Sequence, residues 1–93
     1  MEDVTMPDRF QNNADNATAP ATAPFAIVPD DATPLPSVPK GIYVGGGGTI
    51  TLRGVGGTED VTYRNLPDAS YVAVRALYVR ATGTTATSLI AEA

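Results

Sequence analysis

Four consecutive glycines, Gly45, Gly46, Gly47 and Gly48, form the stretch of this sequence that most resembles a chemical site, because glycine-rich loops often hold phosphate groups. A phosphate loop of the GxxxxGK[ST] type needs a lysine and a hydroxyl after its last glycine, followed by a helix. Here the next residues are Thr-Ile-Thr-Leu, a strand pattern, and the one lysine, Lys40, precedes the cluster. A dinucleotide loop fails as well, because the third glycine is missing at the required spacing. We therefore interpret the cluster as a turn, most similar to a hairpin connection.

The other groups that could do chemistry are two adjacent acid pairs, Asp30-Asp31 and Glu59-Asp60, and a few serines. Neighbouring residues on a strand point to opposite faces, so neither pair forms a general acid/base dyad. The chain has no histidine and no cysteine, which leaves the serines without the usual activating base and limits metal ligands to oxygen. No calcium-loop spacing is present. We predict a protein that is not an enzyme, with no catalytic residue, no cofactor and no metal site.

The composition also restricts the partners. The chain has 93 residues, enough for one small domain, and a net charge of −4. Negative charge disfavours nucleic acids and anionic membrane surfaces. No apolar run approaches the roughly 20 residues that span a bilayer, and the acidic start MEDVTMPDRF does not read as a secretory signal. We expect no nucleic-acid partner, no membrane insertion, and synthesis in a cytoplasm.

The chain divides near Lys40 into two halves of different chemistry. Seven of the eight prolines lie in the first 40 residues, all nine glycines lie after them, and the first 40 residues carry the whole net charge of −4. Proline removes backbone donors and fixes φ. We therefore predict that residues 1–39 form an extended, acidic, Pro-rich arm, with one strand at most, at 25–28.

Two apolar spots interrupt this polar arm: Phe10 and the run that contains Phe25, Ile27 and Val28. One interpretation makes the arm a linker that leads into a first strand. The other treats these four residues as anchors on a neighbouring subunit, so that the arm becomes ordered only in an assembly. The sequence leaves both interpretations open.

Residues 40–93 are predicted to form a small β domain. Runs rich in Val, Ile, Thr and Tyr alternate with turn residues, and in one of them Ile50 and Leu52 alternate with polar residues, as in a strand with one wet face. The expected strand runs are 42–44, 49–53, 61–64, 70–80 and 87–91. Within 70–80 the apolar phase slips after Ala76, which predicts a bulge, a sharp bend or burial on both faces. The fold class is therefore all-β: a small antiparallel β-sandwich or barrel with an extended N-terminal arm.

A domain of this size buries only about 60% of its surface, and this chain has no disulfide to supplement its core. Burial between subunits is the natural remaining source of stability. We therefore expect a homo-oligomer.

Several segments together resemble a known family. They are Phe25-Ala-Ile-Val-Pro-Asp-Asp, Lys40-Gly-Ile-Tyr-Val-Gly-Gly-Gly-Gly, Val61-Thr-Tyr-Arg-Asn-Leu-Pro and Val79-Arg-Ala-Thr-Gly-Thr-Thr-Ala-Thr. In this combination they are similar to the small spike base proteins of tailed phages and of alphaproteobacterial gene transfer agents. The resemblance covers residues 25–91, and the segment ATGTTAT is its most specific part.

The resemblance implies a non-enzymatic structural virion protein on the surface of the head of a phage or gene transfer agent particle. It would be the base of a head spike, attached to the capsid at vertices, and would hold a spike or fibre for host-surface contact. The implied partners are further copies of the chain (a pentamer at a five-fold vertex), the major capsid protein and the spike or fibre protein. The alternative is a free-standing β module that recognises surface glycans through its tyrosines, Tyr43, Tyr63, Tyr71 and Tyr78.

Overall fold

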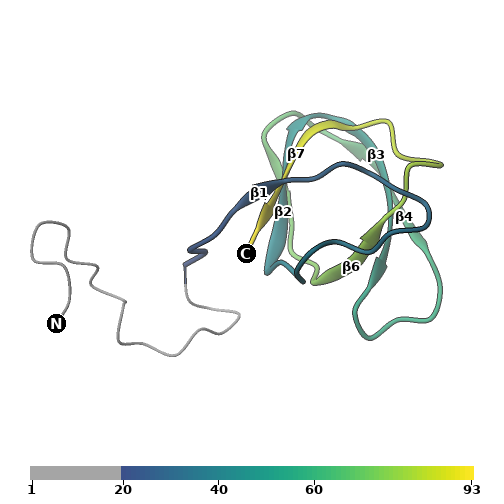
Figure 1. Cartoon of the computed structure of the whole chain (residues 1–93). Helices are drawn as coiled ribbons and strands as arrows, with labels where there is room; N and C mark the ends of the chain where they lie inside the picture. The colour runs from purple at the N-terminus through teal and green to yellow at the C-terminus, as the bar shows by residue number, and fades with distance from the viewer. Residues whose placement is uncertain (1–19) are drawn as a thin grey trace, which may run out of the picture.

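The computed structural model describes residues 20–93, which fold into strands without a helix (Figure 1). No helix within this range could therefore span a membrane. The strands are β1 Phe25–Ala26, β2 Gly41–Gly46, β3 Gly48–Gly54, β4 Val61–Leu66, β5 Ser70–Val72, β6 Ala76–Val79 and β7 Thr87–Glu92. The all-β prediction is confirmed, and each expected strand run coincides with one or two of these elements.

The strands form two antiparallel sheets, which makes the fold a small sandwich and not a closed barrel. The first sheet has the order β1-β7-β2-β5 and the second has the order β4-β3-β6. Strands β7, β2 and β3 lie inside their sheets, and the other four lie at the edges. The chain changes sheet after β2, after β4, after β5 and after β6. The core is therefore enclosed by chain segments that cross from one sheet to the other.

The alternation along the two central strands produces this core. Ile42 and Val44 of β2 and Ile50 and Leu52 of β3 are buried, while the residues between them are more exposed. Successive side chains on a strand point to opposite faces, so each strand directs one apolar row into the space between the sheets. The remaining buried hydrophobic residues are Ile27, Val72, Ala76, Val79, Ala86, Leu89 and Ala91.

The glycine cluster forms a corner between the sheets, so the interpretation as a hairpin is wrong. β2 ends at Gly46 and β3 begins at Gly48, yet these strands pair with different partners in different sheets. The backbone packs closely here: a side chain at Gly47 would collide with the carbonyl oxygen of Leu66. The N–H of Gly47 donates to the Asp68 carboxylate at 2.7 Å. Close approach, more than positive φ, therefore explains the cluster, since within it only Gly48 has a positive φ, of 151°.

The phase slip within residues 70–80 marks a second change of sheet. The run divides into β5, which pairs with β2, and β6, which pairs with β3. Between them the N–H of Val74 donates to the carbonyl of Val72 at 2.9 Å, a tight three-residue turn. The predicted sharp bend is confirmed.

The ATGTTAT segment returns the chain from β6 to β7 by following β3. The amides of Thr85 and Ala86 donate to the carbonyl of Thr49 at 2.8 and 3.1 Å. The Thr51 amide donates to the hydroxyl of Thr84 at 3.0 Å. The threonines of this segment thus occupy donor and acceptor positions that a regular strand would otherwise fill.

Residues 20–39, called here the proline segment, fold onto the sheets, which corrects the expectation of an arm separate from the β domain. In Figure 1 the segment crosses in front of the two sheets and returns to β2. The amides of Ile27, Asp30 and Leu35 donate to Leu89, Val79 and Leu77 at 2.8 to 2.9 Å. The prolines lack donors, but the residues between them reach carbonyl groups of β6 and β7.

Candidate interaction surface

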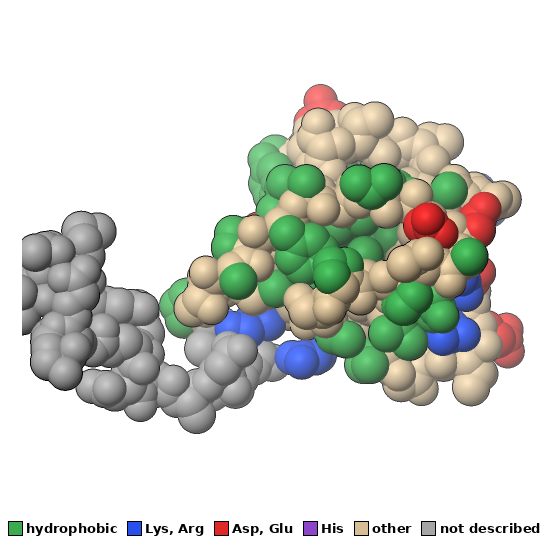
Figure 2. All heavy atoms as spheres, viewed as in Figure 1, with side chains coloured by type: hydrophobic (Ala, Val, Ile, Leu, Met, Phe, Trp, Pro, Cys, Tyr) green, Lys and Arg blue, Asp and Glu red, His purple; other side chains and the backbone are tan. Residues whose placement is uncertain are grey.

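A hollow in the proline segment exposes apolar side chains on one face of the molecule. This apolar groove has a volume of about 290 Å³ and is lined mainly by Phe25, Ile27, Val28, Pro34, Leu35 and Pro36. Figure 2 shows hydrophobic side chains gathered on this face. The proline segment first runs along β7 of the first sheet and then returns beside β6 of the second sheet. The groove lies between these two parts of the segment.

The four predicted anchors have different positions. Ile27 is 7% exposed and belongs to the core of its own subunit, so it is not available as an anchor for another. Phe25 and Leu35 pack partly buried against that core. Val28 is 80% exposed. Phe10 lies outside the described residues.

Asp30 is the charged residue at the rim of the groove. Its Oδ1 accepts hydrogen bonds from the backbone N–H groups of Ala32 and Thr33, at 2.8 and 2.9 Å. These two bonds, the Ala32 bond foremost, lower the pKa of the Asp30 carboxyl, because they favour its charged form. The groove therefore has an apolar wall and one fixed negative charge.

Asp31 fastens the proline segment to the segment that follows β6. Its carboxylate accepts hydrogen bonds from the N–H and the hydroxyl of Thr82, both at 2.8 Å. The backbone N–H of Thr82 is the main cause that lowers the pKa of Asp31, followed by the hydroxyl, and Arg80 adds a weaker effect. Asp30 and Asp31 thus point to different partners, as expected of neighbours in sequence, and do not form a dyad.

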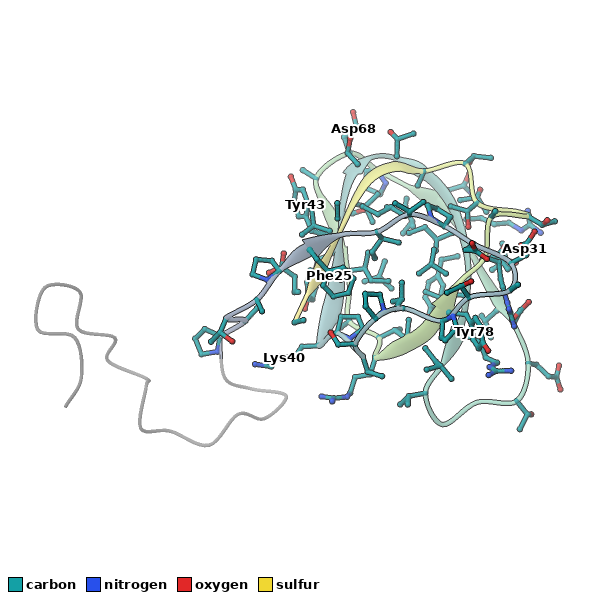
Figure 3. All side chains as sticks on the ribbon, viewed as in Figure 1. Phe25, Asp31, Lys40, Tyr43, Asp68 and Tyr78 are labelled. Atoms are coloured by element: carbon teal, nitrogen blue, oxygen red, sulfur yellow. The ribbon has the colours of Figure 1, made fainter. Side chains whose placement is uncertain are left out.

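Arg80 joins three segments that are far apart in sequence. Its Nη1 donates to the carbonyl of Asp31 at 2.6 Å, and its Nε lies 3.1 Å from a carboxylate oxygen of Asp60. Its guanidinium stacks 4.0 Å from the centroid of the Tyr78 ring, which Arg53 also approaches at 4.5 Å. Figure 3 shows Asp31 and Tyr78 on the same side of the molecule. We call Asp31, Asp60, Tyr78, Arg80 and Thr82 the Arg80 cluster.

The Arg80 cluster was not predicted from the sequence. Arg80 is separated from Asp31 by 49 residues and from Asp60 by 20, so no local pattern connects them. The ion pair between Arg80 and Asp60 joins the segment after β6 to the segment before β4. Arg53 keeps its buried Nε without a hydrogen-bond partner.

The outer faces of the two sheets differ in chemistry. On the first sheet Ala26 lies opposite Ile90, Ile90 opposite Tyr43, and Tyr43 opposite Tyr71. Residues directly opposite each other share a face, so these four form a row across all four strands, called here the tyrosine row. Tyr43 is 39% and Tyr71 is 55% exposed, and Tyr43 points away from the interior in Figure 3.

The outer face of the second sheet is polar. Thr51 lies opposite Thr62, and their hydroxyl groups are 3.1 Å apart. Arg53 lies opposite Tyr78 on the same sheet. Hydrogen bonds and stacking within the subunit already engage these side chains. The tyrosine row, in contrast, offers apolar surface that its own subunit does not cover.

Neither surface has the features of a catalytic or metal centre. Within residues 20–93, no three acidic side chains come together as a metal site. The glycine corner contacts backbone and the Asp68 carboxylate, a neighbour that an anionic phosphate would not favour. The surfaces are instead suited to contact with other proteins.

No protein-family model matches the sequence, and no curated protein matches it. A solved structure does: a chain of the structure titled "Capsid of native GTA particle computed with C5 symmetry", where GTA stands for gene transfer agent. The two chains are 35% identical, and their superposition has a TM-score of 0.80. The match covers 91% of this chain and 98% of that chain, so the likeness extends over the whole fold. On this identity and coverage, the chain belongs to the same family as this structural component of the GTA capsid.

Proposed function

We propose that the protein is a non-enzymatic component of a phage-like particle, located on the head, where it forms the base of a spike. The base is attached to the capsid and holds a spike or fibre that contacts the host surface. One observation carries the proposal: the chain is 35% identical to a chain of a GTA capsid and covers 98% of its length. The segments that resemble spike base proteins specify the role further.

The surface of the domain is consistent with a part that lies between other proteins. It offers two apolar areas, the tyrosine row and the apolar groove, which adjoin at Ala26. A spike base needs at least two contacts, one to the capsid and one to the fibre, besides those to its own copies. Apolar patches rimmed by polar residues are the usual form of such contacts.

A pentamer at a five-fold vertex is the proposed assembly. The related GTA capsid structure was computed with C5 symmetry. Symmetric rings form when each copy makes the same contact with the next one. Contact between copies also adds burial to a core that is small for an independent domain.

Imaging of particles from the producing bacterium tests the proposal. Particles with and without the gene for this chain should differ in density on the head, at the vertices, while the capsid shell stays closed. Restoring the gene with the double substitution Tyr43→Ser and Tyr71→Ser should give reduced occupancy, whereas Thr62→Ser on the polar face should restore full occupancy. Density that is lost from the tail, or heads that do not change, would contradict the role.

A glycan-binding module is the second candidate, and the exposed pair Tyr43 and Tyr71 is the observation that favours it. Two neighbouring aromatic rings on a flat sheet can stack against sugar rings. The purified chain would then bind members of a glycan array, and Tyr71→Ser would abolish that binding. Binding by the chain in a particle-free background, with no effect of gene deletion on the head, would favour this candidate over the spike base.

A further inference from the structure

The apolar groove is open, and its dimensions favour side chains of another polypeptide over a cofactor. Its volume of about 290 Å³ is near the lower limit of roughly 300 Å³ for small-molecule pockets. Its walls are mainly aliphatic or aromatic, and Asp30 and Thr33 are the polar residues among them. One or two apolar side chains would fill it.

The groove has a strongly exposed apolar side chain in its wall and a carboxylate at its rim. Val28 is 80% exposed although it adjoins Phe25 and Leu35, which are partly buried. At the rim, the Asp30 carboxylate carries a negative charge, which the backbone N–H groups of Ala32 and Thr33 favour through hydrogen bonds to Oδ1. A suitable occupant has a large apolar side chain with a cation beside it.

The chain itself contains such a segment outside the described residues. Residues 1–19 include one aromatic residue, Phe10, and one cation, Arg9, directly before it. Phenylalanine matches the apolar wall, and the guanidinium of arginine matches a carboxylate in charge and geometry. No other stretch of residues 1–19 combines these two properties.

The length of the segment before Pro20 is sufficient for Phe10 to reach the groove of a neighbouring copy. The amides of Thr22 and Ala23 both donate to the carbonyl of Ala93, and this fixes the start of the proline segment beside the C-terminus. From there the chain runs through β1 before it forms the groove. Ten residues separate Phe10 from Pro20 and span about 31 Å at roughly 3.1 Å per residue in an extended form.

We propose that Phe10 of one copy occupies the apolar groove of the next copy, with Arg9 beside Asp30. This inference rests on the proposed homo-oligomeric base. A contact that joins the arm of one subunit to a different surface of its neighbour is head-to-tail, and contacts of this type close into rings when the rotation permits. In a closed ring each copy supplies one Phe10 segment and one groove, so every groove is occupied.

Disulfide trapping tests the proposal directly, because the chain contains no cysteine. Two single variants of the purified full chain, Gln11→Cys with an affinity tag and Val28→Cys without one, are mixed, allowed to exchange, and oxidised mildly; Gln11 is next to Phe10, so the proposed anchor is kept. The tagged–untagged dimer should form at least about tenfold faster than in a control mixture, since thiols held at one contact react at millimolar effective concentration. The control replaces Val28→Cys with Val55→Cys, because Val55 is also exposed but does not line the groove.

The outcomes separate this inference from the proposed function. Equal rates in the two mixtures would overturn the groove contact. A chain with both cysteines, Gln11→Cys and Val28→Cys, that forms only an internal disulfide would also overturn it, since the segment would then occupy its own groove. Trapping between copies, together with heads that lack this protein, would retain the contact and reject the spike base. Head density from this protein without trapping between copies would retain the spike base and reject the groove contact.

Discussion

The proline segment, residues 20–39, and the β half, residues 40–93, are held in place by different kinds of interaction. The β half is stabilised by continuous ladders of backbone hydrogen bonds and by buried side chains from both sheets. The proline segment has a two-residue strand, a few isolated backbone bonds and the carboxylate of Asp31. A segment without regular structure can therefore still be part of a core, provided that its few backbone N–H groups reach unpaired carbonyl groups of neighbouring strands.

The same difference explains why the groove lies where it does. A β ladder leaves no gap between neighbouring strands, because each backbone group pairs with the next strand. The proline segment touches β7 and β6 only at separate points, so its two parts can stand apart. The less regular region therefore supplies one of the two apolar surfaces that its own subunit leaves uncovered.

The largest expected effect compares the core contributions of the two regions. Ile50→Ala in β3 should lower the free energy of unfolding by about 2–5 kcal/mol, because it leaves a cavity at a fully buried site. Ile27→Ala in the proline segment should cost about 2 kcal/mol, the lower end of that range, because the adjacent groove is open. Urea unfolding followed by circular dichroism measures both.

Two outcomes would contradict the expected difference between the regions. If Ile27→Ala leaves the unfolding midpoint unchanged, the proline segment is not part of the cooperative core. If it costs as much as Ile50→Ala, the two regions are equally integrated. Val28→Ala is the matched control, because Val28 is exposed and its truncation should have almost no effect on stability.

A smaller effect is expected at the glycine corner of the β half. Gly47→Ala should destabilise the fold by about 1–3 kcal/mol, because the new Cβ collides with the Leu66 carbonyl and forces the backbone to shift. Gly56→Ala is the control: a Cβ there meets no atom, so its cost should stay within about 0.5 kcal/mol. Equal thermal midpoints for the two variants would show that the corner tolerates a side chain and that close packing does not account for Gly47.

The smallest effect is the acid response of the proline segment. The folded-state pKa values of Asp30 and Asp31 are lowered below the ordinary value of 3.8. A group with a lowered folded pKa stabilises the fold above its unfolded pKa, and this contribution is lost as the pH falls through the folded value. Attachment of the segment should therefore stay constant from neutral pH down to about 4 and weaken only below that.

Nuclear magnetic resonance can follow this response at the Thr82 amide, which donates to Asp31. Its chemical shift should titrate with the Asp31 carboxyl, below the ordinary pKa. Asp31→Asn should remove the titration and increase hydrogen exchange at Thr82, with little change at amides inside β2 and β7. A Thr82 amide that titrates at or above 3.8 would contradict the role of Asp31 in holding the segment.

The sequence alone was sufficient for the parts of the fold that depend on local pattern. Alternation located the strands, the phase slip indicated a bend within residues 70–80, and the glycines indicated a sharp change of direction. These features follow from side-chain direction and backbone sterics, which act within a few residues. The absence of histidine and cysteine is likewise a property of the sequence.

Only the tertiary structure decided which strands share a sheet and what the polar residues contact. A hairpin and a corner need the same glycines, and the choice between them depends on the distant partners of β2 and β3. The Arg80 cluster, the tyrosine row and the place of Ile27 in the core all join residues from separate parts of the chain. Burial and charge pairing act between neighbours in space, and a single sequence does not record which distant residues those neighbours are.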